Sequence, residues 1–382
     1  MNGDTMSHPG PRHVSILSTG SYLPGDPIDN ATLERLCGPM PTEVLDNIQV
    51  RQRHWIIDPA TGRHTTGTSA MATTAARRAL ARADIDPAEV DLLVMSSASP
   101  EYQLPAVVTY VQERLGLAHC ASIEFRAACT GFVQGLDYAR RLLADGTYKT
   151  AVVIGAESIS PLLVPMYLGM DPELVRMRDR LVINSFGDGA GAVVLRAGEP
   201  GSADPDGEFR FATACLGGDR KPGMQIVGGG THEPVFDQAK RKRLVEMKLD
   251  VNGTATFGPQ VFVAGMKDML ARTGLTVAEI DACVLPEGNA DYFTAEFDAA
   301  GVSPEDQAVL AKNIVENLTT VGATGSAAVP LALDEGWVEG RVRPGDQVLL
   351  LAVEASRYLY AGLSLRWEAP FAESAEEIDH VA

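Results

Sequence analysis

The residue best placed for nucleophilic chemistry is Cys129. Residues 121–125 predict a short strand and residues 133–144 predict a helix, so the cysteine is expected at the turn between them. The small residues Ala127 and Ala128 permit a tight turn there. The positive end of the helix dipole favours a thiolate, which is a nucleophile at neutral pH. A small buried hydrophobe is the alternative interpretation of a free cysteine, and the turn alone does not separate the two.

The composition predicts a compact α/β protein of the cytoplasm. The 382 residues are 45% hydrophobic and include 37 glycines, which is unlike a disordered or fibrous chain. No apolar run approaches the roughly 18 to 20 residues of a membrane span, and residues 1–12 lack the apolar core of a signal peptide. The 5 cysteines are scattered, which predicts reduced thiols, and the 7 histidines lie too far apart to predict a metal site.

The chain carries a large negative net charge and one short run of basic residues. A net charge of -18 argues against a nucleic-acid partner, because a phosphate-binding surface needs a basic excess. This basic run consists of Lys240, Arg241, Lys242 and Arg243. Such a run is either a solvated helix face or a docking site for an anionic partner, such as a carrier protein or a nucleotide tail.

An internal repeat divides the chain into two similar α/β halves, which we place at 13–206 and 207–369. Residues 88–91 recur as residues 278–281, and each copy lies between a helix and a buried strand. A second match pairs residues 128–131 with residues 322–325, at an offset of 194. We therefore expect two parallel-rich sheets with helices between and outside them. The repeat also places the Cys129 turn opposite its copy around Ala323, at a site between the halves.

The segment 158–180 interrupts this regular pattern. It is rich in leucine and methionine and is broken by three prolines, Pro161, Pro165 and Pro172. An irregular apolar segment of this kind is either a lid or tunnel wall over a binding site or a loop that contacts a second subunit.

Five segments of the chain follow the motifs of one enzyme family in the same order. They are 97–100, 127–132, 186–192, 275–281 and 322–330. They resemble the thiolase superfamily, and within it the ketosynthase III branch (3-oxoacyl-ACP synthase III). The resemblance implies an α/β thiolase fold with a duplicated five-layered αβαβα core, usually in a homodimer. It also implies an acyl thioester on Cys129, formed from acyl-CoA or an acyl-carrier-protein thioester, with no further cofactor.

The chain departs from the family pattern at the partners of the cysteine. Glu287 stands where the resemblance places a histidine, and Ala323 stands where it places an asparagine. Asn289 is a candidate for orienting Glu287 or contacting substrate. A glycine-rich loop of the family is replaced by residues 354–357, in which the backbone of Ser356 is the candidate donor to the acyl oxygen.

These departures favour acyl transfer over decarboxylative condensation. The histidine and asparagine of the family donate hydrogen bonds to an enolate oxygen, and losing one such donor typically costs about 3 to 4 kcal/mol. A carboxylate at Glu287 is suited to accept a proton instead. We therefore expect acyl transfer from Cys129 to an alcohol, amine or carbon nucleophile, in polyketide or other specialised biosynthesis. The alternatives are a decarboxylating 3-oxoacyl-ACP synthase that uses a protonated Glu287, and a catalytically silent partner subunit.

Overall fold

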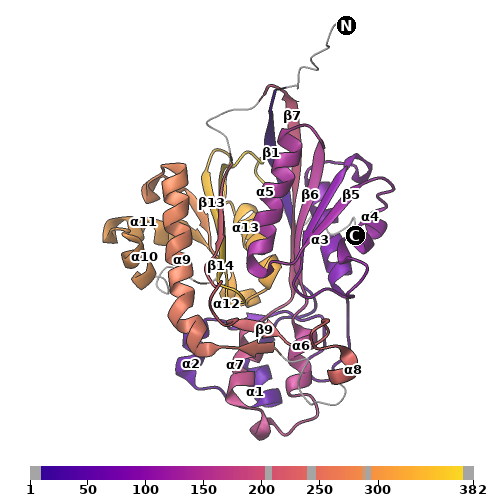
Figure 1. Cartoon of the computed structure of the whole chain (residues 1–382), viewed down its shortest axis with the longest axis vertical. Helices are drawn as coiled ribbons and strands as arrows, with labels where there is room; N and C mark the ends of the chain where they lie inside the picture. Colours follow the sequence, from indigo (N-terminus) through magenta and orange to yellow (C-terminus); the bar gives the residue numbers. More distant parts are fainter. Residues whose placement is uncertain (1–9, 203–208, 239–246, 287, 289–293, 373–382) are drawn as a thin grey trace.

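The computed structural model is built around two five-stranded sheets that lie face to face (Figure 1). It describes residues 10–202, 209–238, 247–286, 288 and 294–372. The strands of the first sheet lie in the order β5-β4-β6-β7-β1. They are β1 (Arg12–Tyr22), β4 (Leu92–Ser96), β5 (Ala121–Phe125), β6 (Thr150–Glu157) and β7 (Gly189–Pro200).

The second sheet repeats the arrangement of the first, with the strand order β12-β11-β13-β14-β8. In each sheet the first three strands of this order pair in parallel and the other two pairings are antiparallel. The expectation of parallel-rich sheets is therefore wrong for half of the pairings. The strands are β8 (Arg210–Cys215), β11 (Ala282–Val284), β12 (Ile314–Val315), β13 (Gln347–Glu354) and β14 (Leu359–Arg366).

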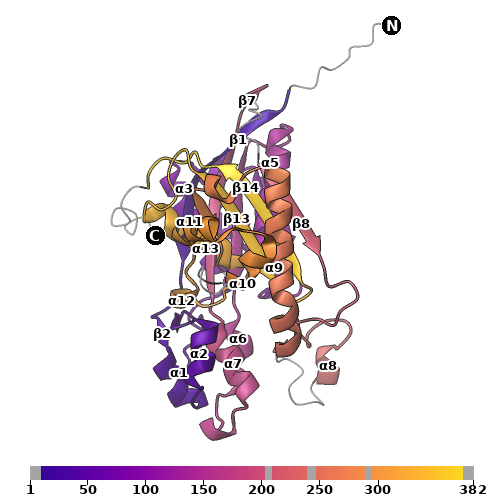
Figure 2. The same cartoon turned by 90° about the vertical axis from the view of Figure 1, so that its left-hand side faces the viewer.

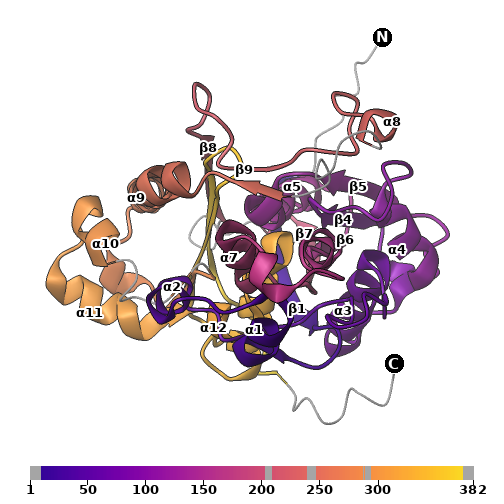
Figure 3. The same cartoon turned by 90° about the horizontal axis from the view of Figure 1, so that it is seen from below.

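Helices fill three layers, between the sheets and on both outer faces (Figure 3). α5 (Gly131–Ala144) and α13 (Ala328–Val338) contact strands of both sheets, and α13 is apolar on nearly all sides because it is enclosed between them. α3 (Thr68–Arg82) and α4 (Val107–Leu115) cover the outer face of the first sheet. α9 (Val251–Thr273) and α11 (Pro304–Asn313) cover the outer face of the second. The five layers predicted from the sequence are confirmed.

A lobe of short helices lies below the layered core (Figure 2). It contains α1 (Asn30–Cys37), α2 (Thr42–Ile48), α6 (Ser160–Leu163) and α7 (Met177–Ser185), with α12 (Leu318–Val321) between it and the core. The remaining elements are short and lie at the periphery or in turns. They are β2 (Ile28–Asp29), β3 (Gln52–Arg53), β9 (Met224–Ile226), β10 (Met247–Leu249), α8 (Val235–Gln238), α10 (Thr294–Ala300) and the 3-10 turns η1 (Pro87–Glu89), η2 (Ala128–Thr130), η3 (Val164–Met166), η4 (Pro172–Leu174), η5 (Val277–Glu279) and η7 (Gly325–Ala327).

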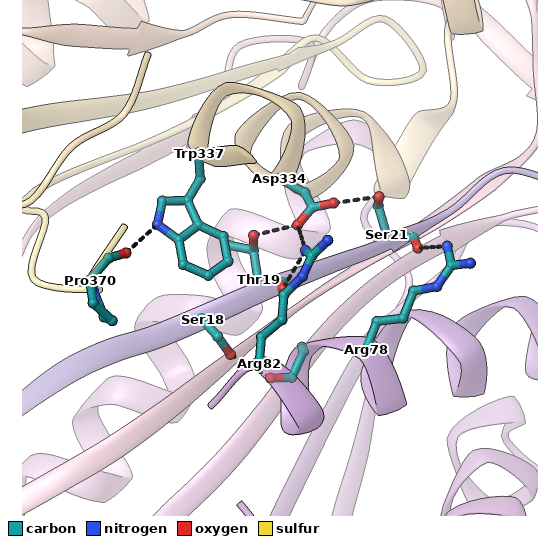
Figure 4. Close-up of polar contacts among 9 residues, drawn as sticks. Ser18, Thr19, Ser21, Arg78, Arg82, Asp334, Trp337 and Pro370 are labelled. Atoms are coloured by element: carbon teal, nitrogen blue, oxygen red, sulfur yellow. Dashed lines mark hydrogen bonds and ion pairs between the residues drawn. The ribbon is translucent and has the colours of Figure 1, made fainter. Parts of the chain in front are cut away.

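A buried polar cluster joins the two halves at Asp334 of α13 (Figure 4). Its carboxylate pairs with the guanidinium of Arg82 at 2.6 Å and accepts hydrogen bonds from the hydroxyls of Thr19 and Ser21. Arg82 also donates to the carbonyl of Thr19 and lies 5.7 Å from the ring centre of Trp337. Since these partners come from β1, α3 and α13, the cluster ties one half of the chain to the other.

No helix in the described part of the chain combines the length and the apolar character needed to cross a bilayer. The predicted boundary between the halves lies in residues 203–208, outside the described residues. It remains a prediction.

Candidate active site

Cys129 lies in a tight elbow between strand β5 and helix α5. The elbow is the turn η2, in which Ala128 adopts the left-handed φ of 45° that residues with a Cβ rarely take. Thr130 closes the turn by donating its hydroxyl to the carbonyl of Ala127 at 2.8 Å. At Gly131 a Cβ would overlap the hydroxyl of Ser96, so only glycine fits the start of the helix. The thiol is partly exposed and lies at the N-terminus of a 14-residue helix, where the helix dipole favours a negative charge.

The second half contains the same elbow in η7, ahead of α13. Gly325 has φ 53° where Ala128 has φ 45°, and Thr324 takes the backbone conformation of Ala127. The structural counterpart of Cys129 is therefore Ser326, so the offset is three residues longer than the sequence match predicted. The match of sequence letters had paired Gly325 with Gly131, whereas the backbone angles pair Gly325 with Ala128.

The two elbows are joined by direct hydrogen bonds. The hydroxyl of Ser326 donates to the carbonyl of Ala128 at 3.0 Å, and the hydroxyl of Ser96 donates to Ser326 at 3.1 Å. Each elbow also packs on the sheet of the other half, η7 against β6 and η2 against β13. Ala128, the residue before Cys129, is thus held in its strained conformation by a side chain of the second half.

A buried carboxylate supports this junction from the end of β6. Glu157, only 2% exposed, accepts hydrogen bonds from the backbone N–H groups of Ala98, Ser99 and Ser326, at 2.9, 2.7 and 3.1 Å. The hydroxyls of Ser97 and Ser99 also donate to it. Glu157 therefore fixes both the loop after β4 and the second elbow, which in turn contacts Ala128.

A cavity of about 250 Å³ opens at the cysteine, and most of its lining area is apolar. Its wall comes from both halves and from the end of α2. The lining residues are Asn47, Ile48, Gln49, Val50, Cys129, Ser185, Pro286, Leu318, Ala323, Thr324, Gly325 and Ala328. Residues 47–50 form part of this wall, and none of the described lining residues falls in the segment 158–180, whose role stays a prediction.

Comparison with known proteins identifies the family. Residues 123–209 match the model of 3-oxoacyl-[acyl-carrier-protein (ACP)] synthase III, and residues 270–367 match the model of its C-terminal part. The chain is 33% identical to "Beta-ketoacyl-[acyl-carrier-protein] synthase III 3" of Streptomyces coelicolor, over 93% of this chain and 98% of that protein. The chain belongs to the 3-oxoacyl-ACP synthase III family. It is therefore a ketosynthase III family enzyme, a transferase that acts on acyl groups.

Solved structures of this family share the fold. "AbyA1 - tetronic acid condensing enzyme" is 28% identical, with a TM-score of 0.78, and the match covers 93% of this chain and 100% of that one. 3-Oxoacyl-(acyl carrier protein) synthase III, FabH, of Pseudomonas aeruginosa PAO1 is 26% identical, with a TM-score of 0.74 over 94% of this chain and 99% of that one. The resemblance to ketosynthase III that the sequence motifs indicated is confirmed.

The structure brings two of the predicted site residues of this ketosynthase III family member to one cavity, Cys129 and Ala323. The backbone of Ala323 is already paired, since its N–H donates to the carbonyl of Ser185 at 2.9 Å and its carbonyl accepts from Gly187 at 3.1 Å. The side chain of Ala323 has no hydrogen-bonding atom, so position 323 supplies no polar group to the cavity.

The other predicted site residues either lie elsewhere or are not described. The N–H of Ser356 donates to the carboxylate of Glu354 at 2.7 Å, and its role as a donor to the acyl oxygen remains a prediction. Glu287 and Asn289 lie outside the described residues, as does the basic run Lys240, Arg241, Lys242 and Arg243.

Sequence reasoning missed Glu157 and Ser326. Glu157 ends β6 and Glu354 ends β13, at the same spacing that separates Cys129 from Ser326. The pair Glu157 and Glu354 is therefore the sequence signal that aligns the second half on the first with Ser326 opposite Cys129.

Proposed function

We propose that this ketosynthase III family enzyme loads an acyl group on Cys129 and passes it to an acceptor, with Glu287 as the base. The observation that carries the proposal is the placement of Pro286. This residue directly precedes Glu287 in the chain and lines the same cavity as Cys129. We expect the carboxylate of the next residue in the chain to reach this cavity, where it is suited to remove a proton from an acceptor bound beside the thioester.

The proposed reaction has two balanced steps. In the first, the Cys129 sulfur attacks the thioester of acyl-CoA or an acyl carrier protein, and the carrier thiol leaves as the acyl–Cys129 bond forms. In the second, the acceptor attacks the acyl carbon, its proton goes to Glu287, and the bond from carbon to the Cys129 sulfur breaks. The proton then returns to the sulfur. No cofactor is needed beyond the thioester substrate.

The acceptor that we favour is a hydroxyl group, and the similarity to AbyA1 supports this choice. A tetronic acid is a five-membered lactone, so making one from two acyl thioesters requires one ester bond and one carbon–carbon bond. A 3-oxoacyl group on Cys129 and a 2-hydroxyacyl thioester together contain the atoms of that ring plus two thiols. The carbon between the two carbonyls of a 3-oxoacyl group is acidic, so a carboxylate base can deprotonate it without decarboxylation.

A mass-spectrometric assay tests the proposal. Acetoacetyl-CoA is the donor, and the N-acetylcysteamine thioester of glycolic acid is the acceptor. We expect an acetoacetyl adduct on Cys129 that the acceptor removes, and an adduct without transfer in Glu287→Gln. Glu305→Gln, which alters an exposed carboxylate, is the matched control and should transfer normally. Absence of any adduct on Cys129 with acyl-CoA or carrier-bound donors would favour a silent partner subunit.

The second candidate is decarboxylating 3-oxoacyl-ACP synthesis, which the name of the Streptomyces coelicolor relative favours. It predicts the release of carbon dioxide from a carrier-bound malonyl donor by the loaded enzyme. Release at catalytically useful rates, with no transfer to the hydroxy thioester, would replace our proposal with this one.

We further propose a cytoplasmic homodimer that receives its substrates from an acyl carrier protein or coenzyme A. Strand β5 lies at the edge of its sheet. Tyr102 and Leu104, between β4 and α4, are exposed large hydrophobic residues. An unpaired edge and exposed apolar side chains are suited to subunit contact. Size-exclusion chromatography with light scattering tests the dimer. Charge reversal at Lys240 and Arg241 tests carrier docking, and should weaken binding of an acyl carrier protein.

A further inference from the structure

Thr324 is a buried threonine on the wall of the Cys129 cavity that the proposed mechanism has not used. It lies between Ala323 and Gly325, at the entry to the second elbow. Its hydroxyl oxygen is closed off from solvent and has no hydrogen-bond partner in the described part of the chain. Buried hydroxyls nearly always have a partner, so this one calls for an explanation.

The first elbow shows that the fold does not require a hydroxyl at this position. Ala127 takes the same place and nearly the same backbone conformation there, with no polar side chain. The buried hydroxyl of Thr130, in contrast, is paired with the carbonyl of Ala127 at 2.8 Å. An unpaired buried hydroxyl destabilises the empty protein, and in Thr324 nothing in the elbow offsets that cost.

We propose that the hydroxyl of Thr324 donates a hydrogen bond to the thioester carbonyl oxygen of the acceptor during transfer. Thr324 lines the cavity, and no hydrogen bond to the described residues occupies its hydroxyl, which is therefore available to a bound acceptor. Position 323 supplies no donor, and Thr324 is the adjacent residue on the same wall. The bond orients the acceptor for attack on the acyl group, and it stabilises the negative charge that forms on that oxygen when the ring closes.

This inference rests on the proposed function and narrows it to an acceptor that carries a carbonyl as well as a hydroxyl. The atom balance of transfer is unchanged. The acceptor hydroxyl forms the ester bond, and Cys129 returns as a thiol. In ring closure the acidic carbon of the 3-oxoacyl ester gives its proton to Glu287 and forms the carbon–carbon bond at the acceptor carbonyl. The acceptor thiolate leaves and takes up that proton.

The test compares Thr324→Val with Thr324→Ser, using acetoacetyl-CoA and the glycolyl N-acetylcysteamine thioester. Loading of Cys129 and decay of the adduct after acceptor addition are measured separately by mass spectrometry. We expect Thr324→Val to slow transfer by about 100-fold relative to loading, and Thr324→Ser to retain most of the transfer rate. Thr324→Val should also raise the melting temperature by about 2 °C, because it removes an unpaired hydroxyl.

Thr130→Val is the matched control, since it removes a paired hydroxyl and should lower the melting temperature. Unchanged transfer in Thr324→Val, or a lower melting temperature with loading and transfer slowed alike, would overturn the inference. These outcomes are distinct from failure of the proposed function, in which the wild-type protein itself forms no adduct or transfers nothing.

Discussion

Replacing Asp334 with alanine should destabilise the protein strongly, because it leaves a buried cation without its partner. The side chains of Arg82 and Asp334 are only 8% and 5% exposed, and their charged atoms lie 2.6 Å apart. Removing one member of a buried pair costs about 3 to 5 kcal/mol. The hydroxyl of Thr19, which is fully buried, also loses its acceptor. We expect Asp334→Ala to lower the free energy of unfolding by about 4 kcal/mol.

Urea unfolding followed by circular dichroism, at one fixed protein concentration, measures this loss. The double variant Arg82→Met with Asp334→Leu removes both charges and should cost much less than Asp334→Ala alone. Arg272→Ala, which breaks an exposed pair with Asp268, is the control and should cost below about 1 kcal/mol. A loss below about 1 kcal/mol for Asp334→Ala, or a double variant as unstable as the sum of its parts, would refute the reasoning from burial.

Three further predictions concern the elbows and a buried carboxyl. Ala128→Gly relieves the left-handed strain at φ 45° and should stabilise the protein by about 0.5 kcal/mol. It should also slow loading of Cys129, because the elbow becomes less rigid; mass spectrometry of the adduct measures the rate, and faster loading would contradict the prediction. Gly155→Ala places a Cβ on the carbonyl of Ser326 and should lower the free energy of unfolding by about 2 kcal/mol, as measured by urea unfolding. An unchanged free energy of unfolding would mean that β6 and η7 can move apart without loss of stability. Burial raises the pKa of Asp188 from 3.8 to about 6, so the folded state holds this proton more tightly than the unfolded chain does. The associated stability, about 3 kcal/mol, should be present below pH 4 and lost as the pH rises to 6. Urea unfolding at several pH values measures it. The same pH dependence of the unfolding free energy in the wild type and in Asp188→Asn would show that the folded carboxyl is already ionised between pH 4 and 6.

Much of the fold was predictable from local sequence signals. The strand expected at residues 121–125 coincides with β5 (Ala121–Phe125). The helix-to-strand repeat was also placed correctly. In both copies a short capped turn precedes the buried strand, η1 in one half and η5 in the other.

The geometry of the candidate site was less predictable. The register of the elbow repeat depends on which residue holds a positive φ, and Ala128 holds one although alanine rarely does. The interaction of Ser326 with Ala128 joins residues 198 positions apart, and no local pattern encodes such a contact. The cavity wall from residues 47–50 was missed for the same reason, since only the packing of the small lobe brings α2 to the cysteine.

The crossed packing of the two elbows bears on how the enzyme is made. A ribosome releases the segment around Cys129 long before it releases Ser326, the side chain that bonds to Ala128. Until then the strained turn lacks that support, and Cys129, the proposed nucleophile, is not yet held in its final geometry. We therefore expect the thiol to react with acyl thioesters only once the whole polypeptide has been assembled.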